Sequence, residues 1–423
     1  TAEQRAEVLA RPPQTRDREL VDTTANIIRM VRDRGDHALY QLTREYDAVE
    51  LSTLTTEPLE RSAVLGLIGK QAVEAIDAAY SNLRTFHLGL IPQRFSTEVS
   101  PGVFCERRWS PLDSAGLYVP GGATPLVSTA LMLGVPAQLA GVERPVIVSP
   151  PDSTGIMAPA IRYAAGLCGI DEIWTLGGAQ AIAALAYGTQ TLNSVDKIFG
   201  PGNRYVTEAK LQVSADPDGS RIDMPAGPSE VLVLADDQAR ADFIAADLLA
   251  QAEHGPDSQV VLVSDSSPVI AKVKELVAER ARDLPRSETI SSAMLHARFI
   301  LVPDLAAGTS VVNAYAPEHL IIQTKDHKDV LKLVRHAGSI FLGPWSPESV
   351  GDYASGTNHV LPTYGFARAY GGLSVEDFMV SSTVQELSLE GLRHLSKTVT
   401  SLARLENLEA HARAVDIRVE TSS

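Results

Sequence analysis

Short apolar runs of strand length alternate with longer segments of helical periodicity through the middle of the chain. This pattern is typical of βαβ units, in which a parallel sheet carries helices on its faces. The strand-like runs lie at 144–150, 171–178 and 195–203, and the helix-like segments lie at 154–169, 179–188 and 204–214. Turns of small residues at 120–122, 177–178 and 200–202 fall near the predicted strand ends, where open parallel sheets bind ligands.

A second alternating region begins at 229–236, after a crossover marked by Pro225, Gly227 and Pro228. Its helix-like segments lie at 242–254 and 268–284, and its further strand-like runs lie at 259–265, 297–304, 319–324 and 338–345. The whole pattern therefore predicts an α/β fold with two Rossmann-like parallel-sheet lobes.

The C-terminal segment carries an apolar stripe at three-to-four spacing, which predicts an amphipathic helix. The stripe consists of Leu392, Leu395, Val399 and Leu402. Because this segment follows the last strand signals, we expect the stripe to dock on something other than the two lobes. The first twenty residues carry too few apolar groups to fold alone.

At 423 residues the chain is long enough for two or more domains with cores of their own. Its formal net charge of -15 argues against binding to nucleic acid or to an anionic membrane, since phosphate binding needs clustered Lys and Arg. No apolar run approaches the roughly 20 residues of a membrane span, and the N-terminal stretch shows no signal-peptide h-region. Cys105 and Cys168 lack CxxC spacing, which argues against a thiolate zinc site and fits a reducing cytoplasm.

Two fragments each pair residue types that suit acid–base or metal chemistry. Gln251 and His254 lie three apart at the end of a predicted helix, so their side chains project from one face. Glu318 and His319 are adjacent after Pro317, and both can serve one site only where the backbone is irregular. Each fragment also has an ordinary structural explanation, namely a histidine at a helix C-terminus and a surface helix cap.

Two more fragments lie in a loop and at a helix end. The loop 351–363 holds Asp352 and His359 among turn-forming residues, although such a loop is usually a solvated connection. Near the C-terminus, 406–411 carries two acids and a histidine, which alone is typical of a solvated face. Together the four fragments offer N and O donors that suit a divalent ion such as zinc. With no GxGxxG or GxxxxGK[ST] motif, the residues alone indicate an α/β metalloenzyme of unspecified reaction.

Eight stretches, in order along most of the chain, resemble the histidinol dehydrogenase family, whose members close the histidine biosynthetic pathway. They are "GLYVPGG" (116–122), "GGAQAIAALAYGT" (177–189), "DKIFGPGN" (196–203), "DMPAGPSEVLVLAD" (223–236), "LLAQAEHGPDSQ" (248–259), "APEHL" (316–320), "GSIFLGPWSPES" (338–349) and "GDYASGTNHVLPT" (351–363).

The resemblance implies a catalytic pair, Glu318 and His319, and one zinc ion in each subunit. The implied zinc ligands are Gln251, His254, Asp352 and His411, of which His411 reaches over from the partner subunit. The implied contacts to L-histidinol are Ser229, Gln251, His254, His319, Asp352, His359, Glu406 and His411, with Glu409 as a rival for Glu406. The implied contacts to NAD+ are Tyr118, Gln180 and Asn203.

The same resemblance implies a homodimer with shared active sites and a chain of several parts. An N-terminal extension is expected at 1–17. The first α/β lobe is expected to combine 18–117 with 231–373, and the second, NAD-binding lobe to span 118–230. The helical C-terminal segment 374–423 is expected to be swapped in the dimer.

The reaction implied is the four-electron oxidation of L-histidinol to L-histidine through bound L-histidinal, with two NAD+ used in succession. His319 is the expected base, and Glu318 is expected to take a proton from the water that hydrates histidinal. Two other classes of protein remain possible from these residues. A zinc hydrolase would need no nicotinamide, and an imidazole-binding protein would turn nothing over.

Overall fold

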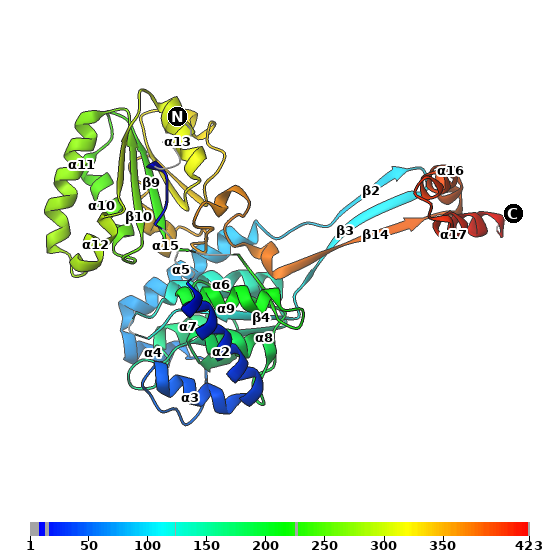
Figure 1. Ribbon diagram of the computed structural model, residues 1–423, viewed down its shortest axis with the longest axis horizontal. Coiled ribbons are helices and arrows are strands. Elements are labelled where there is room, and N and C mark those ends of the chain that lie inside the picture. The colour runs from blue at the N-terminus through cyan, green and yellow to red at the C-terminus, as the bar shows by residue number, and fades with distance from the viewer. Residues whose placement is uncertain (1–7, 13–16, 123, 225–226, 422–423) are drawn as a thin grey trace.

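Two sheets covered by helices form the body of the protein in this computed structural model (Figure 1). The structure describes residues 8–12, 17–122, 124–224 and 227–421, so Pro225 and most of the expected N-terminal extension lie outside the described part. The predicted α/β class with two parallel-sheet lobes and a helical C-terminal segment is confirmed.

The first sheet has the strand order β1-β6-β5-β4-β7-β8, and all neighbours except β1 pair in parallel. Its strands are β1 (Thr55–Thr56), β4 (Ser114–Tyr118), β5 (Arg144–Ser149), β6 (Glu172–Thr175), β7 (Lys197–Phe199) and β8 (Arg221–Ile222). The crossover helices are α6 (Val127–Ala140), α7 (Pro159–Leu167), α8 (Gly178–Tyr187) and α9 (Arg204–Ala215). The chain adds β5 and β6 on one side of β4 and then β7 and β8 on the other. This reversal creates a topological switch point between β4 and β7, where such sheets bind ligands.

Four N-terminal helices pack on this first sheet and not on the second one. They are α2 (Arg18–Arg34), α3 (Asp36–Tyr46), α4 (Arg61–Ile68) and α5 (Lys70–Leu88). Ile27 and Val31 of α2 share a hydrophobic core with Ile182 of α8, and Leu83 of α5 shares one with Leu133 of α6. The packing therefore differs from the expected grouping of 18–117 with 231–373. The apolar stripes on these helices predict burial, but they carry no information about which sheet covers them.

The second sheet is wholly parallel, with the order β11-β10-β9-β12-β13. Its strands are β9 (Glu230–Ala235), β10 (Gln259–Ser264), β11 (Arg298–Leu301), β12 (His319–Gln323) and β13 (Ser339–Leu342). Its helices are α10 (Ala241–Ala252), α11 (Ser267–Arg280), α12 (Ser287–Met294), α13 (Leu305–Tyr315), α14 (His327–Leu331) and α15 (Glu348–Tyr353). Each of these strands falls within a predicted apolar run. The three central strands, β9, β10 and β12, are short and buried on both faces, as expected for a parallel sheet with helices on each side.

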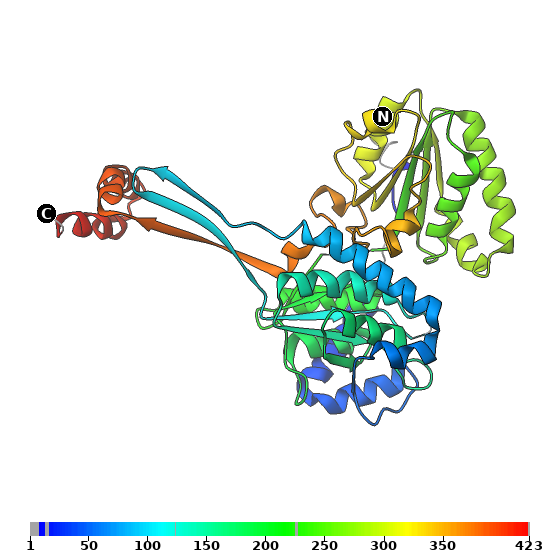
Figure 2. The same ribbon diagram turned by 180° about the vertical axis from the view of Figure 1, so that it is seen from behind.

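A three-stranded antiparallel arm leaves the body and ends in two helices (Figure 1, Figure 2). The strands are β2 (Phe95–Ser100), β3 (Val103–Pro111) and β14 (Met379–Leu387), and the helices are α16 (Leu389–Leu405) and α17 (Glu409–Glu420). Phe199 of β7 stacks on Phe378 at the base of the arm, with ring centroids 4.0 Å apart. The hydrophobic pattern did not predict these strands, because most of their residues are exposed and show no regular alternation of burial.

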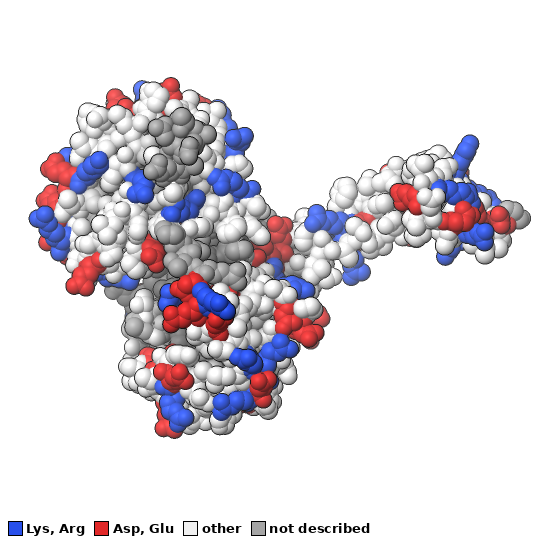
Figure 3. All heavy atoms as spheres, viewed as in Figure 1, with Lys and Arg blue, Asp and Glu red and all other residues white. Residues whose placement is uncertain are grey.

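The predicted amphipathic helix is α16, and its apolar stripe remains partly uncovered within the chain. Leu402 is 55% exposed and Leu405 is 81% exposed at the end of this helix. Charged side chains gather around the tip, whereas they are sparser along the arm (Figure 3). None of the described helices combines the length and the apolar character needed to cross a bilayer.

Candidate active site at the amino edge of the second sheet

Glu318 and His319 lie at the start of β12, and both side chains are buried. Ala316, just before them, has a φ of 53°, so the backbone turns sharply before the strand begins. This turn lets the two adjacent side chains approach one another, and His319 Nδ1 lies 3.7 Å from Glu318 Oε2. Glu230, at the start of the neighbouring β9, holds both residues. Its N–H donates to Glu318 Oε2 at 2.8 Å, and its carbonyl oxygen lies 3.2 Å from His319 Nδ1.

The end of α10 brings Gln251 and His254 to the same edge. Gln251 is fully buried, and neither its Oε1 nor its Nε2 has a hydrogen-bond partner among the described residues. His254 follows the last helical turn and is partly exposed, and its N–H donates to the Gln251 carbonyl at 3.2 Å. Its Nε2 lies 4.0 Å from Asp352 Oδ2, so the helix end with Gln251 and His254 meets the segment 351–363 here.

Asp352 lies on the short helix α15, whereas the sequence indicated a loop. One turn earlier, Glu348 points to the same site, and sequence reasoning missed this residue. Asp352 Oδ1 lies 3.6 Å from His319 Nε2, and Glu348 Oε1 lies 3.8 Å from His319 Nδ1. Candidate ligand atoms of His254, Glu348 and Asp352 all lie within 4.8 Å of one another. The only sequence signal for Glu348 is its i, i+4 spacing to Asp352, which is also common on solvated helices.

His359 ties this site to the first lobe. Its Nδ1 lies 2.9 Å from the carbonyl oxygen of Asp352, and its Nε2 lies 3.1 Å from Thr129 Oγ1. Thr129 belongs to the first turn of α6, which begins beyond the carboxyl end of β4. The amino edge of the second sheet therefore meets the carboxyl edge of the first. Ser229 immediately precedes β9 at the same amino edge, where its carbonyl oxygen accepts from the N–H of Gln259 at 3.2 Å.

The small residues around Asp352 are needed because another helix lies close to them. Gly356 has a φ of 106°, and a Cβ on it would lie 2.8 Å from the carbonyl oxygen of Asn82 in α5. Asn358 donates from Nδ2 to the carbonyl oxygen of Met132 at 2.7 Å. The loop after α15 is thus clamped against helices of the first lobe and is not a free surface connection.

Burial dominates the electrostatics of the site. It raises the pKa of Glu318 to about 8 and that of Glu348 to about 8. For His319, burial favours the neutral ring, but the carboxylates of Glu348, Glu318 and Asp352 outweigh it and raise the pKa to about 10. Burial opposes ionisation of Asp352 as well, yet the hydrogen bond and charge of His319 keep its pKa below the usual value. The three carboxyl groups around one imidazole repel one another when ionised, and a cation bound beside them would offset that repulsion.

The residues present fit a zinc ion. An amide with no partner at full burial is unusual, because burying a polar group without a hydrogen bond costs free energy. Gln251 is such a group, and it lies in the helix turn that also carries His254 toward Asp352. Imidazole, carboxylate and amide donors without thiolate suit zinc and leave coordination positions for a substrate.

Glu406 and His411 are not brought to this site within one chain. Glu406 caps α16 and His411 lies in α17, both exposed at the tip of the arm and distant from α10 and α15 (Figure 1). The rival residue, Glu409, is engaged locally, since Arg404 donates from Nε to its Oε2 at 3.0 Å.

A second candidate site lies at the switch point of the first sheet. Tyr118 ends β4, and its hydroxyl oxygen accepts from the N–H of Gly178 at 3.2 Å. Gln180 is buried in the first turn of α8. Asn203 caps α9, where its Oδ1 accepts from the N–H groups of Tyr205 and Val206 at 3.0 and 3.1 Å. The three residues predicted to contact NAD+ therefore lie at or just beyond the carboxyl ends of β4, β6 and β7 of one sheet.

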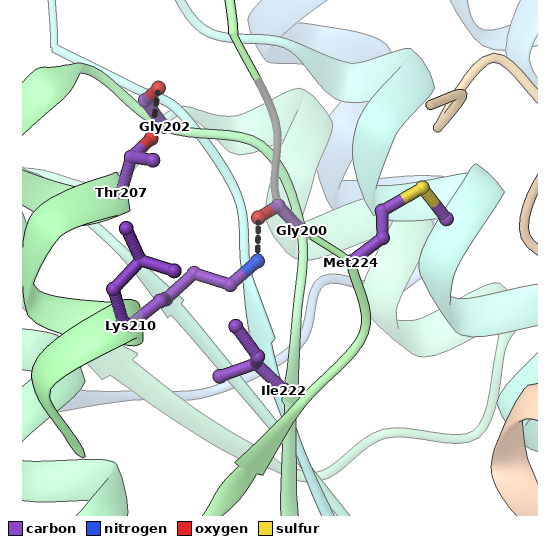
Figure 4. Close-up of a pocket in the computed structure, with 7 residues that line it drawn as sticks. Gly200, Gly202, Thr207, Lys210, Ile222 and Met224 are labelled. Atoms are coloured by element: carbon purple, nitrogen blue, oxygen red, sulfur yellow. Dashed lines mark hydrogen bonds between the residues drawn. The ribbon is translucent and has the colours of Figure 1, made fainter. Parts of the chain in front are cut away.

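The turn 200–203 between β7 and α9 is held by hydrogen bonds, one of which comes from Lys210 of α9 (Figure 4). Lys210 donates from Nζ to the carbonyl oxygen of Gly200 at 2.8 Å and pairs with Asp223. The N–H of Gly200 donates to Asp223 Oδ2 at 2.8 Å. Gly200 has a φ of 113°, and a Cβ there would lie 2.1 Å from the Tyr118 carbonyl oxygen, so only glycine fits.

Known proteins match the chain over nearly its whole length. The profile of the family described as histidinol dehydrogenase matches residues 10–419. A histidinol dehydrogenase of Colwellia psychrerythraea is 51% identical over 422 residues, which cover 100% of this chain and 97% of that protein. A histidinol dehydrogenase of Vibrio parahaemolyticus is 50% identical over 418 residues, which cover 99% of this chain and 96% of that protein. The crystal structure of histidinol dehydrogenase from Elizabethkingia anophelis, at 40% identity, matches with a TM-score of 0.96 and covers 100% of this chain and 96% of that one.

Proposed function

The chain belongs to the histidinol dehydrogenase family, and on that premise we propose that it oxidises L-histidinol to L-histidine through bound L-histidinal. This four-electron oxidation uses two NAD+ and is the last step of histidine biosynthesis. The observation that carries the proposal is the convergence of a buried Glu318–His319 pair with His254 and Asp352. That arrangement places an acid–base pair beside donors that suit a metal-held substrate.

Zinc is the proposed metal, held by Gln251, His254 and Asp352 of one subunit and His411 of the partner subunit. Support comes from the buried Gln251 amide, which has no hydrogen-bond partner in the described part of the chain, and from the close approach of His254 to Asp352. Bound there, the ion would orient the imidazole and amine nitrogens of the substrate and would take no part in redox chemistry.

His319 is the proposed base in both oxidation steps. Its imidazole would take the hydroxyl proton of histidinol as the hydride departs, and later a proton of the hydrated aldehyde. Asp352 is one of the carboxylates that raise the pKa of His319, so engaging Asp352 with a cation brings the ring toward the neutral form that a base needs. Glu318 would take a proton from the water that adds to histidinal, because its buried carboxylate lies beside His319.

NAD+ is the proposed hydride acceptor, bound at the switch point of the first sheet by Tyr118, Gln180 and Asn203. Two features support this placement. The strand-end turn before α9 is fixed by Lys210, and the first turn of α6 contacts the catalytic edge through Thr129 and His359. The closed contact between the lobes would also keep the reactive aldehyde from escaping between the two steps.

A homodimer with shared active sites is proposed from the arm. The stripe on α16 is partly uncovered in the single chain, and an apolar surface of this kind favours association. A second copy of the chain would cover the stripe and would bring Glu406 and His411 to the partner's site. Within that site, Ser229 and His359 are the proposed further contacts to histidinol. As a biosynthetic enzyme with two unpaired cysteines, the protein is proposed to work in the cytoplasm.

The test is the absorbance of NADH after L-histidinol and NAD+ are added to the protein. We expect two NADH per histidinol consumed, and loss of the signal after chelation. A zinc hydrolase or an imidazole-binding protein would give no NADH at all, and that result would exclude the proposed reaction.

A further inference from the structure

A short N-terminal strap, residues 8–12, crosses the amino edge of the second sheet. Three side chains of the body hold its carbonyl oxygens. Arg298 donates from Nε to Val8 at 3.3 Å, and Gln259 donates from Nε2 to Ala10 at 3.2 Å. The hydroxyl of Tyr364 donates to Pro12 at 2.8 Å. The strap is thus anchored on the body at three points, although the N-terminal residues cannot fold alone.

Arg11, in the middle of the strap, points into the body and forms a forked ion pair. Its Nε and Nη2 donate to the two carboxylate oxygens of Glu230, at 2.7 and 3.1 Å. The side chains are 12% and 3% exposed, so water screens this pair little. The guanidinium also lies over the ring of Tyr315, 3.9 Å from its centroid, and the Tyr315 hydroxyl lies within hydrogen-bond distance of Glu230. A planar, forked donor is what this site requires.

Glu230 is also the residue that holds the catalytic pair. Its backbone N–H donates to Glu318, and its carbonyl oxygen lies next to His319 Nδ1. Its side chain accepts from the N–H of Tyr364 at 2.7 Å. Arg11 therefore reaches Glu318 and His319 through a single intervening residue.

Arg11 also binds the turn at Ala316, which lets the side chains of Glu318 and His319 point into one site. Its Nη2 donates to the carbonyl oxygens of Tyr315 and Ala316, at 2.8 and 3.3 Å. Ala316 has a φ of 53°, and Tyr364, which donates to Glu230, has a φ of 57°. Non-glycine residues in this region are strained and persist only where the surroundings hold them. The contacts of Arg11 and Glu230 supply such a restraint on both turns.

We propose that Arg11 is a positioning residue for the catalytic pair, so that the N-terminal strap helps to hold Glu318 and His319 in place. This inference rests on the proposed function. It predicts a specific defect, since Arg11 contacts the segment that carries Glu318 and His319. The proposed metal ligands lie elsewhere, at the end of α10, on α15 and, from the partner subunit, on α17. Loss of Arg11 is therefore expected to impair turnover more than the binding of substrate or zinc.

Two substitutions and a matched control test this in the zinc-loaded protein. Arg11→Ala removes the guanidinium, and Arg11→Lys keeps the charge without the fork. Arg298→Met removes another arginine that holds the strap but does not touch Glu230. We expect kcat to fall about tenfold to a hundredfold in Arg11→Ala, less in Arg11→Lys, and little in Arg298→Met. The KM for histidinol and the zinc content are expected to stay within about threefold of the unmodified protein.

Rescue by guanidinium separates positioning from general damage. At concentrations well below those that unfold the protein, guanidinium chloride should raise kcat of Arg11→Ala several-fold, and sodium chloride at the same concentration should not. Arg298→Met and the unmodified protein should show no such gain. If Arg11→Ala does not fold, Arg11→Lys tests the proposal instead. Its kcat is expected to be intermediate, with KM unchanged.

Hydrogen–deuterium exchange supplies a measurement that does not depend on turnover. Arg11→Ala and Arg11→Lys should each speed exchange in 314–320 and 363–366, with no change in 241–252. Unchanged kcat and exchange, or parallel losses of kcat and histidinol binding without rescue, would overturn the proposal for Arg11. An unmodified protein that yields no NADH would instead overturn the proposed function, and the exchange data would still decide whether Arg11 holds the turn.

Discussion

Glu348 Oε1 lies 3.8 Å from His319 Nδ1, and both side chains are buried. Glu348 comes from the first turn of α15, whereas His319 begins a strand of the second sheet. The imidazole is thus flanked by Glu348 and Glu318 on its Nδ1 side and faces Asp352 with Nε2. The Glu230 carbonyl oxygen, 3.2 Å from Nδ1, is the hydrogen-bond partner of that nitrogen, and the charge of Glu348 beside it further restrains the ring, so Nε2 is the nitrogen available to act as a base.

Glu348→Gln is therefore expected to lower kcat about tenfold to a hundredfold, because it weakens the orientation of His319. Zinc content, measured by atomic absorption, should remain near one ion per subunit, since the proposed ligands are other residues. The kcat of Glu348→Asp should lie between that of Glu348→Gln and that of the unmodified protein. Loss of zinc in parallel with activity would identify Glu348 as a ligand instead.

Glu318 and His319 are expected to differ in the two half-reactions. Glu318→Gln should spare oxidation of histidinol but slow oxidation of histidinal about a hundredfold, since only hydration of the aldehyde needs the activated water. His319→Asn should slow both steps. Single-turnover measurements with each substrate give the answer, and equal losses in both steps for Glu318→Gln would contradict this division of roles.

Removal of the metal is expected to abolish turnover while the fold persists. The candidate ligands lie at element ends, and each lobe has a hydrophobic core of its own. A chelator should therefore eliminate NADH formation with little change in far-ultraviolet circular dichroism, and added zinc should restore it. Full activity in the chelated protein would exclude a role for zinc in holding the substrate.

Delivery of His411 to the partner subunit is tested by refolding two inactive variants together, His411→Asn and Asp352→Asn. Half of the randomly paired dimers would be mixed, and each mixed dimer would hold one intact site of two. About a quarter of wild-type activity should therefore return. Each variant refolded alone serves as the control. If mixed dimers form and stay inactive, His411 does not act in trans.

His87 is expected to make the fold sensitive to mild acid. The ring is fully buried in α5, and neither of its nitrogens has a hydrogen-bond partner among the described residues. Burial lowers its pKa to about 4, so the unfolded chain takes up a proton at higher pH than the folded one does. Stability is therefore lost as pH falls from about 6.5 toward 4.

Between pH 7 and pH 5 this effect is about 2 kcal/mol in the free energy of unfolding. His87→Leu should lose less stability than the unmodified protein over that interval, as measured by urea denaturation. His394→Gln, which alters an exposed histidine of α16, should behave like the unmodified protein. Equal pH dependence in all three proteins would contradict the assignment to His87.

Much of this protein follows from the sequence alone. Strands such as β9, β10 and β12 are buried on both faces, so each appears as a short apolar run between helical segments, and the class of fold follows. Gln251 with His254, and Glu318 with His319, are recognisable because the two members of each pair are close neighbours in the sequence. The motifs that resemble the histidinol dehydrogenase family extend that reading to the whole chain, and the comparison with known proteins confirms the family.

The tertiary structure decided what depends on residues distant in sequence. Arg11 and Glu230 are 219 positions apart, and no local periodicity connects a residue of the N-terminal strap to the start of a strand. Glu348 resembles any helical acid until α15 packs against β12. The arm strands are largely exposed within the chain, so they lack the alternation that identifies a strand with one buried face. Hydrophobic periodicity shows which face of an element is to be buried, and only tertiary packing determines which residues contact that face.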